Sequence, residues 1–257
     1  MNRVNAGHWR SIGAPLLIIL ATLIAWQLLT VAFEIPVFLL PPPSTVAPYL
    51  VLSAPELFDD IISTLTVTIA GFALGTLAGF ILSLGMANIK AIERSIYPYV
   101  LTLRIIPTLS FAPLFLVWFG FNVFPLVLMA ASTCFFSVVV NGLAGLRSTN
   151  RTTLEMMASL NASRLQVIKY VRLYDSLPYL FAGLKSGITL ALVGAVVGEF
   201  VIADRGLGFQ IVTATHYINT RLLFSAVLYV SLMGLALFAT ITLLESRVLR
   251  WKRLVET

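Results

Sequence analysis

Long apolar runs are the feature that most constrains how this chain folds. Six of them lie at residues 14–33, 62–86, 96–119, 123–146, 182–202 and 222–243. Each is long enough to cross a hydrocarbon core of ~30 Å as a helix, which takes about 20 apolar residues. Charged residues make up only 11% of the chain, whereas soluble domains carry about 25%. We therefore predict an all-α membrane protein with six transmembrane helices in a single domain, residues 1–257.

The third and first runs have features of their own. In the third, Pro107 and Pro113 predict kinks, because proline removes a helix hydrogen bond. The first is longer than the core of a signal peptide and no small-residue cleavage site follows it, so we expect a retained span. The sequence "LLPPPSTVAPYL" after it is expected to form an extended connection, because each proline fixes φ and restricts the residue before it.

The Lys and Arg residues indicate the orientation of the spans. Most of the 17 lie before the first run, between the second and third, between the fourth and fifth, and after the sixth. Residues 34–60 contain acidic residues but no Lys or Arg. Because cytoplasmic loops are enriched in Lys and Arg, we expect both termini and residues 147–178 in the cytoplasm and 34–60 outside. The basic residues are spread over four segments, so the net charge of +6 reflects topology and not a nucleic-acid surface.

The polar segment 147–178 has helix-start signals at two places. Thr152 and Glu155 have the spacing of a capping box, and so do Ser163 and Gln166. A capping box satisfies backbone N–H groups that would otherwise be unpaired at a helix N-terminus. Two short helices are therefore predicted between the fourth and fifth apolar runs.

A turn is predicted between these two helices. Asn161 suits the left-handed conformation that ends a helix, so we place the helices at 153–160 and 164–173, with the turn at Asn161 and Ala162. Pro178 should close the segment before the fifth span. The residues alone leave two interpretations open, an amphipathic hairpin on the membrane surface and a docking element for a cytoplasmic partner, which exposed methionines would suit.

The same segment resembles the EAA motif of inner-membrane permease subunits of ABC importers. The motif reads Glu-Ala-Ala, three residues, Gly, nine residues, Ile, one residue, Leu-Pro. Glu155, Val171 and Leu173 lie at its spacing. The departures are Met156 and Met157 for the two alanines, Asn161 for Gly and Tyr174 for Pro.

The resemblance extends over most of the chain. The stretches "FLLPPPSTV", "IPTLSFAPLFLVWFG" and "VVGEFVIADRGLGFQI" resemble the nitrate, sulfonate and taurine branch of these permeases, and thiamine-precursor permeases look similar. The resemblance implies a type I importer of the bacterial inner membrane, with two permease copies, two cytoplasmic ATPase subunits and an external binding protein.

This resemblance also implies what the chain itself does. The chain would bind no cofactor, and the partner ATPase would hold ATP and Mg. The sequence has no GxxxxGK[ST] phosphate loop, so we expect a transport subunit and not an enzyme. The polar segment 147–178, which we call the insert, would be the coupling helix. Its ATPase-coupling residues would be Thr152, Glu155, Met156, Met157, Leu160, Asn161, Ala162, Ser163 and Gln166.

The resemblance implies a small anionic substrate such as a sulfonate, taurine or nitrate. A thiamine precursor or another small heterocycle is the alternative. A secondary carrier is disfavoured, because such carriers usually show paired halves and this chain shows no internal repeat. A third functional class is a membrane scaffold that recruits a soluble protein and transports nothing.

Arg104 is a strong base well inside an apolar run. An uncompensated charge in lipid is costly, so it should face a cavity, a partner or the interface. It lies eight residues beyond the start of the third run, or ~12 Å along a helix, so its side chain could reach the surface. Lining an anion pathway is the other interpretation.

Three further polar residues are candidates for the translocation pathway. Glu199 ends the fifth run and either pairs with Arg205 or Arg221 or lies near an outer gate. Ser137 and Asn141, one turn apart, either line a polar route or hydrogen-bond across helices.

The remaining features favour packing. Gly71, Gly75 and Gly79 are spaced by four, which allows close approach of another helix. Cys134 is expected to pack inside the fourth run, and "ADRGLGFQIVTATHY" should form a turn and a short half-inserted helix. No metal-ligand spacing occurs in the sequence.

Overall fold

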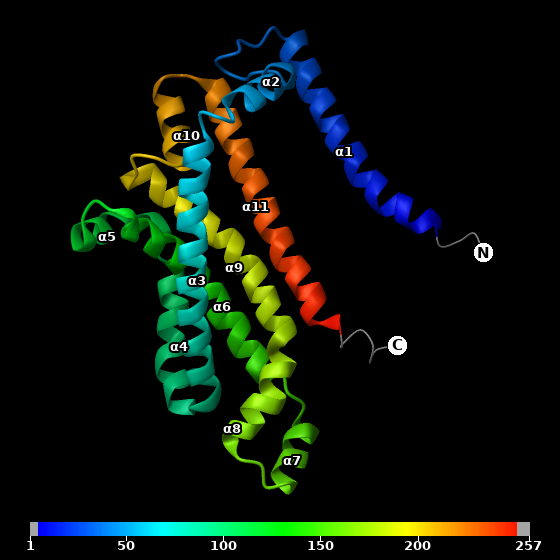
Figure 1. Ribbon diagram of the computed structural model, residues 1–257, viewed down its shortest axis with the longest axis vertical. Coiled ribbons are helices and arrows are strands. Elements are labelled where there is room, and N and C mark those ends of the chain that lie inside the picture. The colour runs from blue at the N-terminus through cyan, green and yellow to red at the C-terminus, as the bar shows by residue number, and fades with distance from the viewer. Residues whose placement is uncertain (1–4, 251–257) are drawn as a thin grey trace. The chain divides into compact units, whose positions relative to one another are not determined.

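The computed structural model describes residues 5–250, with side chains from Leu17 onward, as two compact units. Unit 1 comprises Met1–Phe58 and Gln210–Leu228, and unit 2 comprises Asp59–Phe209 and Tyr229–Thr257. Every regular element within the described range is a helix, which confirms the predicted all-α class (Figure 1). The boundaries near 209 and 228 fall inside helices α10 (Leu207–His216) and α11 (Thr220–Val248).

Unit 2 is built around α6 (Val123–Arg147). Helices α3 (Phe58–Asn88) and α9 (Leu173–Ile202) pack closely against it, because glycines face its backbone. A Cβ atom at Gly75 would lie 2.5 Å from the carbonyl oxygen of Ala131, and one at Gly194 would lie 2.7 Å from that of Met129. Close packing by the glycines of the second run is thus confirmed within one chain.

Four predicted spans are present as long apolar helices. They are α3, α6, α11 and the continuous helical segment Arg164–Ile202, which includes α9. The buried thiol of Cys134 lies inside α6, as predicted. A part-buried ion pair, with Lys185 Nζ 2.9 Å from Glu245 Oε2, joins α9 to α11.

The third predicted span is not one helix. α4 (Lys90–Ile105) begins six residues before the predicted start at 96, and it is followed by a short 3₁₀ turn, η1 (Thr108–Ser110), and by α5 (Phe111–Phe119). The two helical parts meet at 93°, a break and not a kink. Ile106 is extended, as steric conflict with the following Pro107 favours. Pro113 lies in the first turn of α5, where a missing N–H costs no helix bond, so it does not kink the helix.

Unit 1 contains α1 (Asn5–Ala32) and α2 (Pro43–Ser53). The described apolar part of α1, Leu17–Ala32, is shorter than a typical span. The "LLPPPSTVAPYL" segment is only partly extended, because Pro43 begins α2 at a position where a missing N–H is tolerated. Gln27 and Ser44 exchange two hydrogen bonds of 3.1 Å between these helices.

Candidate functional site

A cavity of about 370 Å³ lies in unit 2 at the break between α4 and α5. One wall is a polar stripe on α6, formed by Thr133, Ser137 and Asn141. These residues are spaced by four, so they share one helix face. α9 contributes Ser186 to the lining, and α4 contributes Arg104. Three of the four pathway candidates therefore line one cavity.

The polar stripe is held in place by hydrogen bonds. The hydroxyl oxygens of Ser137 and Ser186 lie 2.7 Å apart, and Thr133 Oγ1 donates to the carbonyl of Leu190 at 2.8 Å. Asn141 Nδ2 donates to the carbonyl of Ser137 at 2.8 Å. The same side chains thus line the cavity and make hydrogen bonds, Ser137 across to α9 and Asn141 within α6.

Arg104 is the one charged residue among those that line this cavity. It makes no ion pair within the described residues and lies in the last turn of α4. Because α4 begins at Lys90, Arg104 lies 14 residues along the helix, or ~21 Å from that end instead of ~12 Å. The Arg104 side chain is exposed in this single chain and contributes to the lining of the cavity.

Glu199 lies outside this cavity and has no arginine partner in the described part of the chain. Its side chain is buried, with 1% of the residue exposed. The carboxylate accepts bonds from Thr64 Oγ1 at 2.8 and 3.0 Å and from the backbone N–H of Gly208 at 2.7 Å. Of the interpretations left open by the sequence, pairing with Arg205 is wrong, because hydrogen bonds from a hydroxyl and a backbone amide satisfy the carboxylate instead.

Glu199 is part of a larger group of polar contacts that we call the polar clamp. It consists of Asp60, Thr64, Glu199 and the backbone N–H groups of residues 206–208. Asp60 Oδ1 accepts from Gly206 N at 2.6 Å, and Thr64 Oγ1 accepts from Leu207 N at 2.8 Å. Two carboxylates thus face the N-terminus of α10, where helix N–H groups are otherwise unpaired and the dipole favours negative charge.

Gly206 gives the polar clamp its geometry. Its φ is 107°, a conformation that residues with a Cβ rarely adopt. A Cβ atom there would also clash with the carboxylate of Glu199. The predicted turn and short helix after the fifth run are confirmed, with the helix at Leu207–His216.

The first helix of the insert begins earlier than predicted. α7 spans Arg151–Ser159, and its N-cap is Asn150, whose side chain accepts from Thr152 N at 3.0 Å. The predicted Thr152–Glu155 capping box is therefore wrong, because asparagine is at least as good an N-cap as threonine. Glu155 instead forms a pair of 2.9 Å with Arg151 one turn before it, on an exposed surface.

The turn that follows agrees with the prediction. Asn161 has a φ of 52°, and Ala162 N donates to the carbonyl of Met157 at 3.0 Å, which completes a Schellman-type helix end. The Ser163–Gln166 capping box is confirmed, with bonds of 2.7 and 3.3 Å. Nearby, the side chains of Met156 and Leu160 are exposed.

The second predicted helix of the insert is not a separate element. α8 (Arg164–Val167) continues through a π turn, η2 (Ile168–Arg172), directly into α9. The predicted end near residue 173 and the predicted stop at Pro178 are wrong, because Pro178 lies inside α9. Proline is tolerated inside membrane helices where neighbouring groups satisfy the freed carbonyl.

The fold and the cavity define the class of this protein: a membrane-integral helical protein with a polar, positively charged cavity among its helices. Residues 71–250 match the family described as binding-protein-dependent transport system inner membrane component. The chain therefore belongs to this family and is an inner-membrane permease subunit of an ABC importer. Such subunits are not enzymes, and a separate ATPase subunit hydrolyses ATP.

Two relatives and one solved structure illustrate the similarity. The chain is 35% identical to the riboflavin transport system permease protein of Chloroflexus aurantiacus, over 95% of this chain and 92% of that protein. It is 30% identical to the formylaminopyrimidine transport permease protein of Halalkalibacterium halodurans, over 93% and 96%. A chain from the crystal structure of an amino acid ABC transporter shares the fold, with a TM-score of 0.63, 23% identity, and coverage of 77% of this chain and 96% of that one.

Proposed function

We propose that this permease imports a small anionic nutrient, such as a sulfonate, taurine or nitrate. The observation that supports this class of substrate is Arg104, which is the only charge among the residues lining the cavity and has no carboxylate partner there. A guanidinium presents a fork of donors that matches planar oxyanions. The hydroxyl and amide groups of Ser137, Asn141 and Ser186 would complete the coordination.

Family membership supports a proposal for the rest of the assembly. Two copies of the chain, each one transmembrane domain of six spans, would form the pathway, with α1 and the broken α4–α5 pair counted as spans. Two ATPase subunits that hold ATP and Mg would dock on the insert, and an external protein would deliver the substrate. The chain would carry no cofactor and would lie in the bacterial inner membrane with both termini in the cytoplasm.

A small heterocycle is the second candidate substrate. The relatives at 35% and 30% identity are named for riboflavin and formylaminopyrimidine transport. Phe111 and Phe136 line the cavity and offer aromatic surfaces for a planar ring. In this case Asn141 would recognise ring substituents, and Arg104 would have a smaller role.

Uptake by the complete transporter separates the two candidates. Proteoliposomes with the permease, its ATPase and its binding protein should accumulate radiolabelled taurine, sulfonate or nitrate, and not riboflavin or an aminopyrimidine. The reverse preference would establish the heterocycle. ATP-independent uptake of any of them by the permease alone would contradict an ABC importer and indicate a secondary carrier.

The topology gives a prediction that needs no substrate. In a Cys134→Ala background, a cysteine at Ser163 should react with an impermeant thiol reagent only after cells are permeabilised, because residue 163 would be cytoplasmic. A cysteine at the exposed Glu56 should react in intact cells. Labelling of the Ser163 position in intact cells would reverse the proposed orientation.

The turn of the insert gives a prediction about coupling. Asn161→Val should weaken ATPase attachment or uncouple ATP hydrolysis from uptake, because a β-branched residue is strongly disfavoured at a φ of 52°. Asn161→Gly is the matched control and should behave as wild type. Ser163→Ala should have a smaller effect, since loss of such a cap costs about 1 kcal/mol. Co-purification with the ATPase and substrate-stimulated hydrolysis measure the outcome, and a fully coupled Asn161→Val transporter would contradict it.

A further inference from the structure

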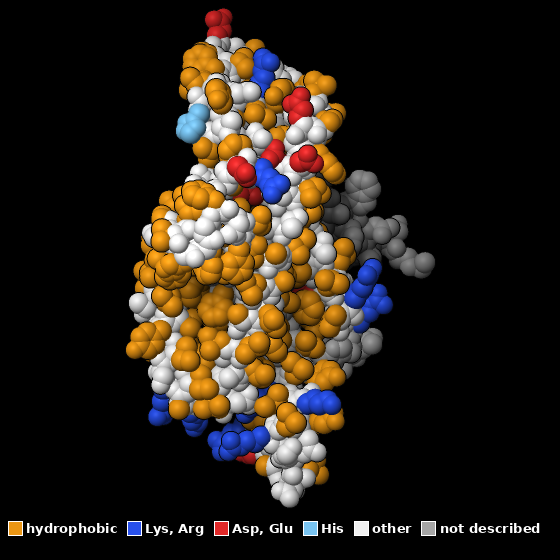
Figure 2. All heavy atoms as spheres, turned by 60° about the vertical axis from the view of Figure 1, so that its left-hand side comes forward, with side chains coloured by type: hydrophobic (Ala, Val, Ile, Leu, Met, Phe, Trp, Pro, Cys, Tyr) orange, Lys and Arg blue, Asp and Glu red, His pale blue; other side chains and the backbone are white. Residues whose placement is uncertain are grey.

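A second cavity, of about 480 Å³, lies at the basic end of unit 2. It separates the corner where α3 meets α4 from the second part of the insert. Three of its lining residues, Lys90, Arg164 and Arg172, are cationic, and none is acidic. Figure 2 shows Lys and Arg side chains gathered at this end of unit 2. We call this cavity the basic pocket.

The cations of the basic pocket have no counter-ion in the described part of the chain. Arg172 Nη1 makes two long hydrogen bonds, of 3.4 Å to the carbonyl of Ala87 and 3.3 Å to Asn88 Oδ1. A guanidinium has five N–H donors, so most of its capacity is unused. Lys90 and Arg164 make no ion pair there, and the nearby Glu93 is paired with Arg147.

We propose that the basic pocket binds the phosphate group of an anionic membrane lipid. A phosphodiester carries the missing negative charge and offers oxygens that arginine binds through parallel hydrogen bonds. The pocket lies where the apolar helix α3 ends, which is the depth of lipid headgroups if α3 spans the membrane. Ile89, between two lining residues, is 51% exposed and gives the lipid tail an apolar surface.

The position of the pocket gives the bound lipid a role. Lys90 belongs to the start of α4, whereas Arg164 and Arg172 belong to the helical segment that forms the second part of the insert. One phosphate between them links the insert to the α3–α4 corner. Anionic lipid would therefore hold the insert in a fixed position against the spans, and coupling to the ATPase would depend on lipid charge.

Native mass spectrometry of the purified full chain in detergent tests the proposal. Wild type should retain phosphatidylglycerol in preference to phosphatidylcholine of the same chain length. Each removed charge should weaken lipid retention about fivefold, so Lys90→Gln with Arg172→Gln should weaken it about 25-fold. The matched control, Arg94→Gln with Lys169→Gln, removes the same charge outside the lining and should retain the lipid as wild type does.

The outcomes separate the sources of the phosphate. Displacement of the lipid by millimolar inorganic phosphate would identify a soluble phosphate as the ligand and would contradict the proposal of a lipid ligand. Equal retention of the two lipids, or equal loss in the control, would show unspecific charge attraction. Normal lipid retention combined with lost ATPase co-purification would assign the cations to the ATPase interface. Arg164→Gln serves as a control for misfolding, because Arg164 is exposed and makes no hydrogen bond to α3 in the described residues. This substitution alone should weaken lipid retention about fivefold.

Discussion

Glu199→Ala is expected to destabilise the permease and to abolish most of its transport. The substitution leaves the Thr64 hydroxyl and the Gly208 N–H buried without their acceptor. Each orphaned buried donor costs about 1–3 kcal/mol, and the removed side chain leaves an empty volume. The unfolding midpoint in detergent should fall by roughly 5–15 °C. Uptake should fall more than tenfold, because the N-terminus of α10 loses its partners.

Two variants make this prediction specific. Glu199→Gln keeps one acceptor oxygen but places an NH₂ group where a donor is already present, so about half of the destabilisation should remain. Asp204→Ala removes an exposed carboxylate close in sequence to the polar clamp and should leave the unfolding midpoint unchanged. A wild-type midpoint and wild-type uptake for Glu199→Ala would show that the polar clamp contributes nothing.

Arg104→Gln should lower uptake of an anionic substrate by about 10- to 100-fold, without loss of assembly. Hydrogen bonds from a charged donor contribute about 1.5–3 kcal/mol, and this cavity offers no second cation among its lining residues. Arg104→Lys should retain part of the activity, because lysine keeps the positive charge but lacks the forked pair of N–H donors of the guanidinium. Uptake in proteoliposomes and co-purification with the ATPase are the two measurements.

Arg94→Gln is the matched control for Arg104. It lies on the same helix, ten residues earlier, and outside the lining of the cavity that contains Arg104. Its uptake should equal that of wild type. Normal anion uptake by Arg104→Gln would remove the anion pathway from the proposal and leave the heterocycle as the substrate class.

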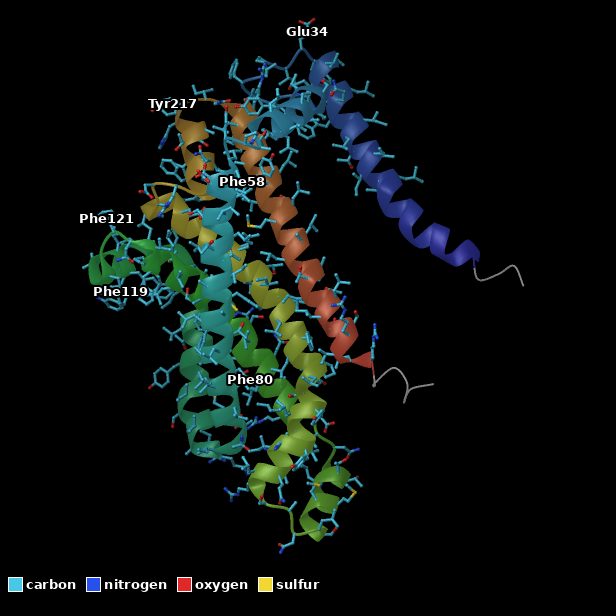
Figure 3. The ribbon with its side chains drawn as sticks, viewed as in Figure 1. Glu34, Phe58, Phe80, Phe119, Phe121 and Tyr217 are labelled. Carbon is cyan, nitrogen blue, oxygen red and sulfur yellow. The ribbon has the colours of Figure 1, made fainter. Side chains whose placement is uncertain are left out.

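The lengths and positions of most helices could be predicted from the sequence. Apolar runs record burial in lipid, and they located α3, α6 and α11 to within about five residues, whereas α9 begins nine residues before the predicted start at 182. Apolar runs carry no information on the direction of a helix axis, so the 93° break after Ile105 was expected only as a kink. Figure 3 shows the result, with Phe119 and Phe121 at the end of the projecting α5, away from the core.

The polar clamp could not be predicted, for a different reason. Thr64 and Glu199 are separated by 135 positions, and three of the four donors in the clamp are backbone N–H groups that leave no trace in residue type. In the sequence, the polar clamp shows only as a glycine that follows an acidic residue in an apolar stretch. That pattern alone suggests a turn. The N-cap of α7 was predicted wrongly for a local reason. Asn150 and Thr152 are both good N-caps, and only packing selects between them.

The continuity of Arg164–Ile202 has a mechanical consequence. Its 39 residues form a rod of ~58 Å, with the insert at one end and Glu199 near the other. Between them lie Ser186 and Leu190, which line the cavity that contains Arg104. A tilt of ~5° about one end would move the other by ~5 Å, about one helical turn. A movement imposed on residue 164 would thus reach the cavity wall without passing through any loop. The π turn at Ile168–Arg172 and Pro178 both interrupt the regular helical bonding of the rod, so the stiffness at these two places would set how much of the movement is transmitted.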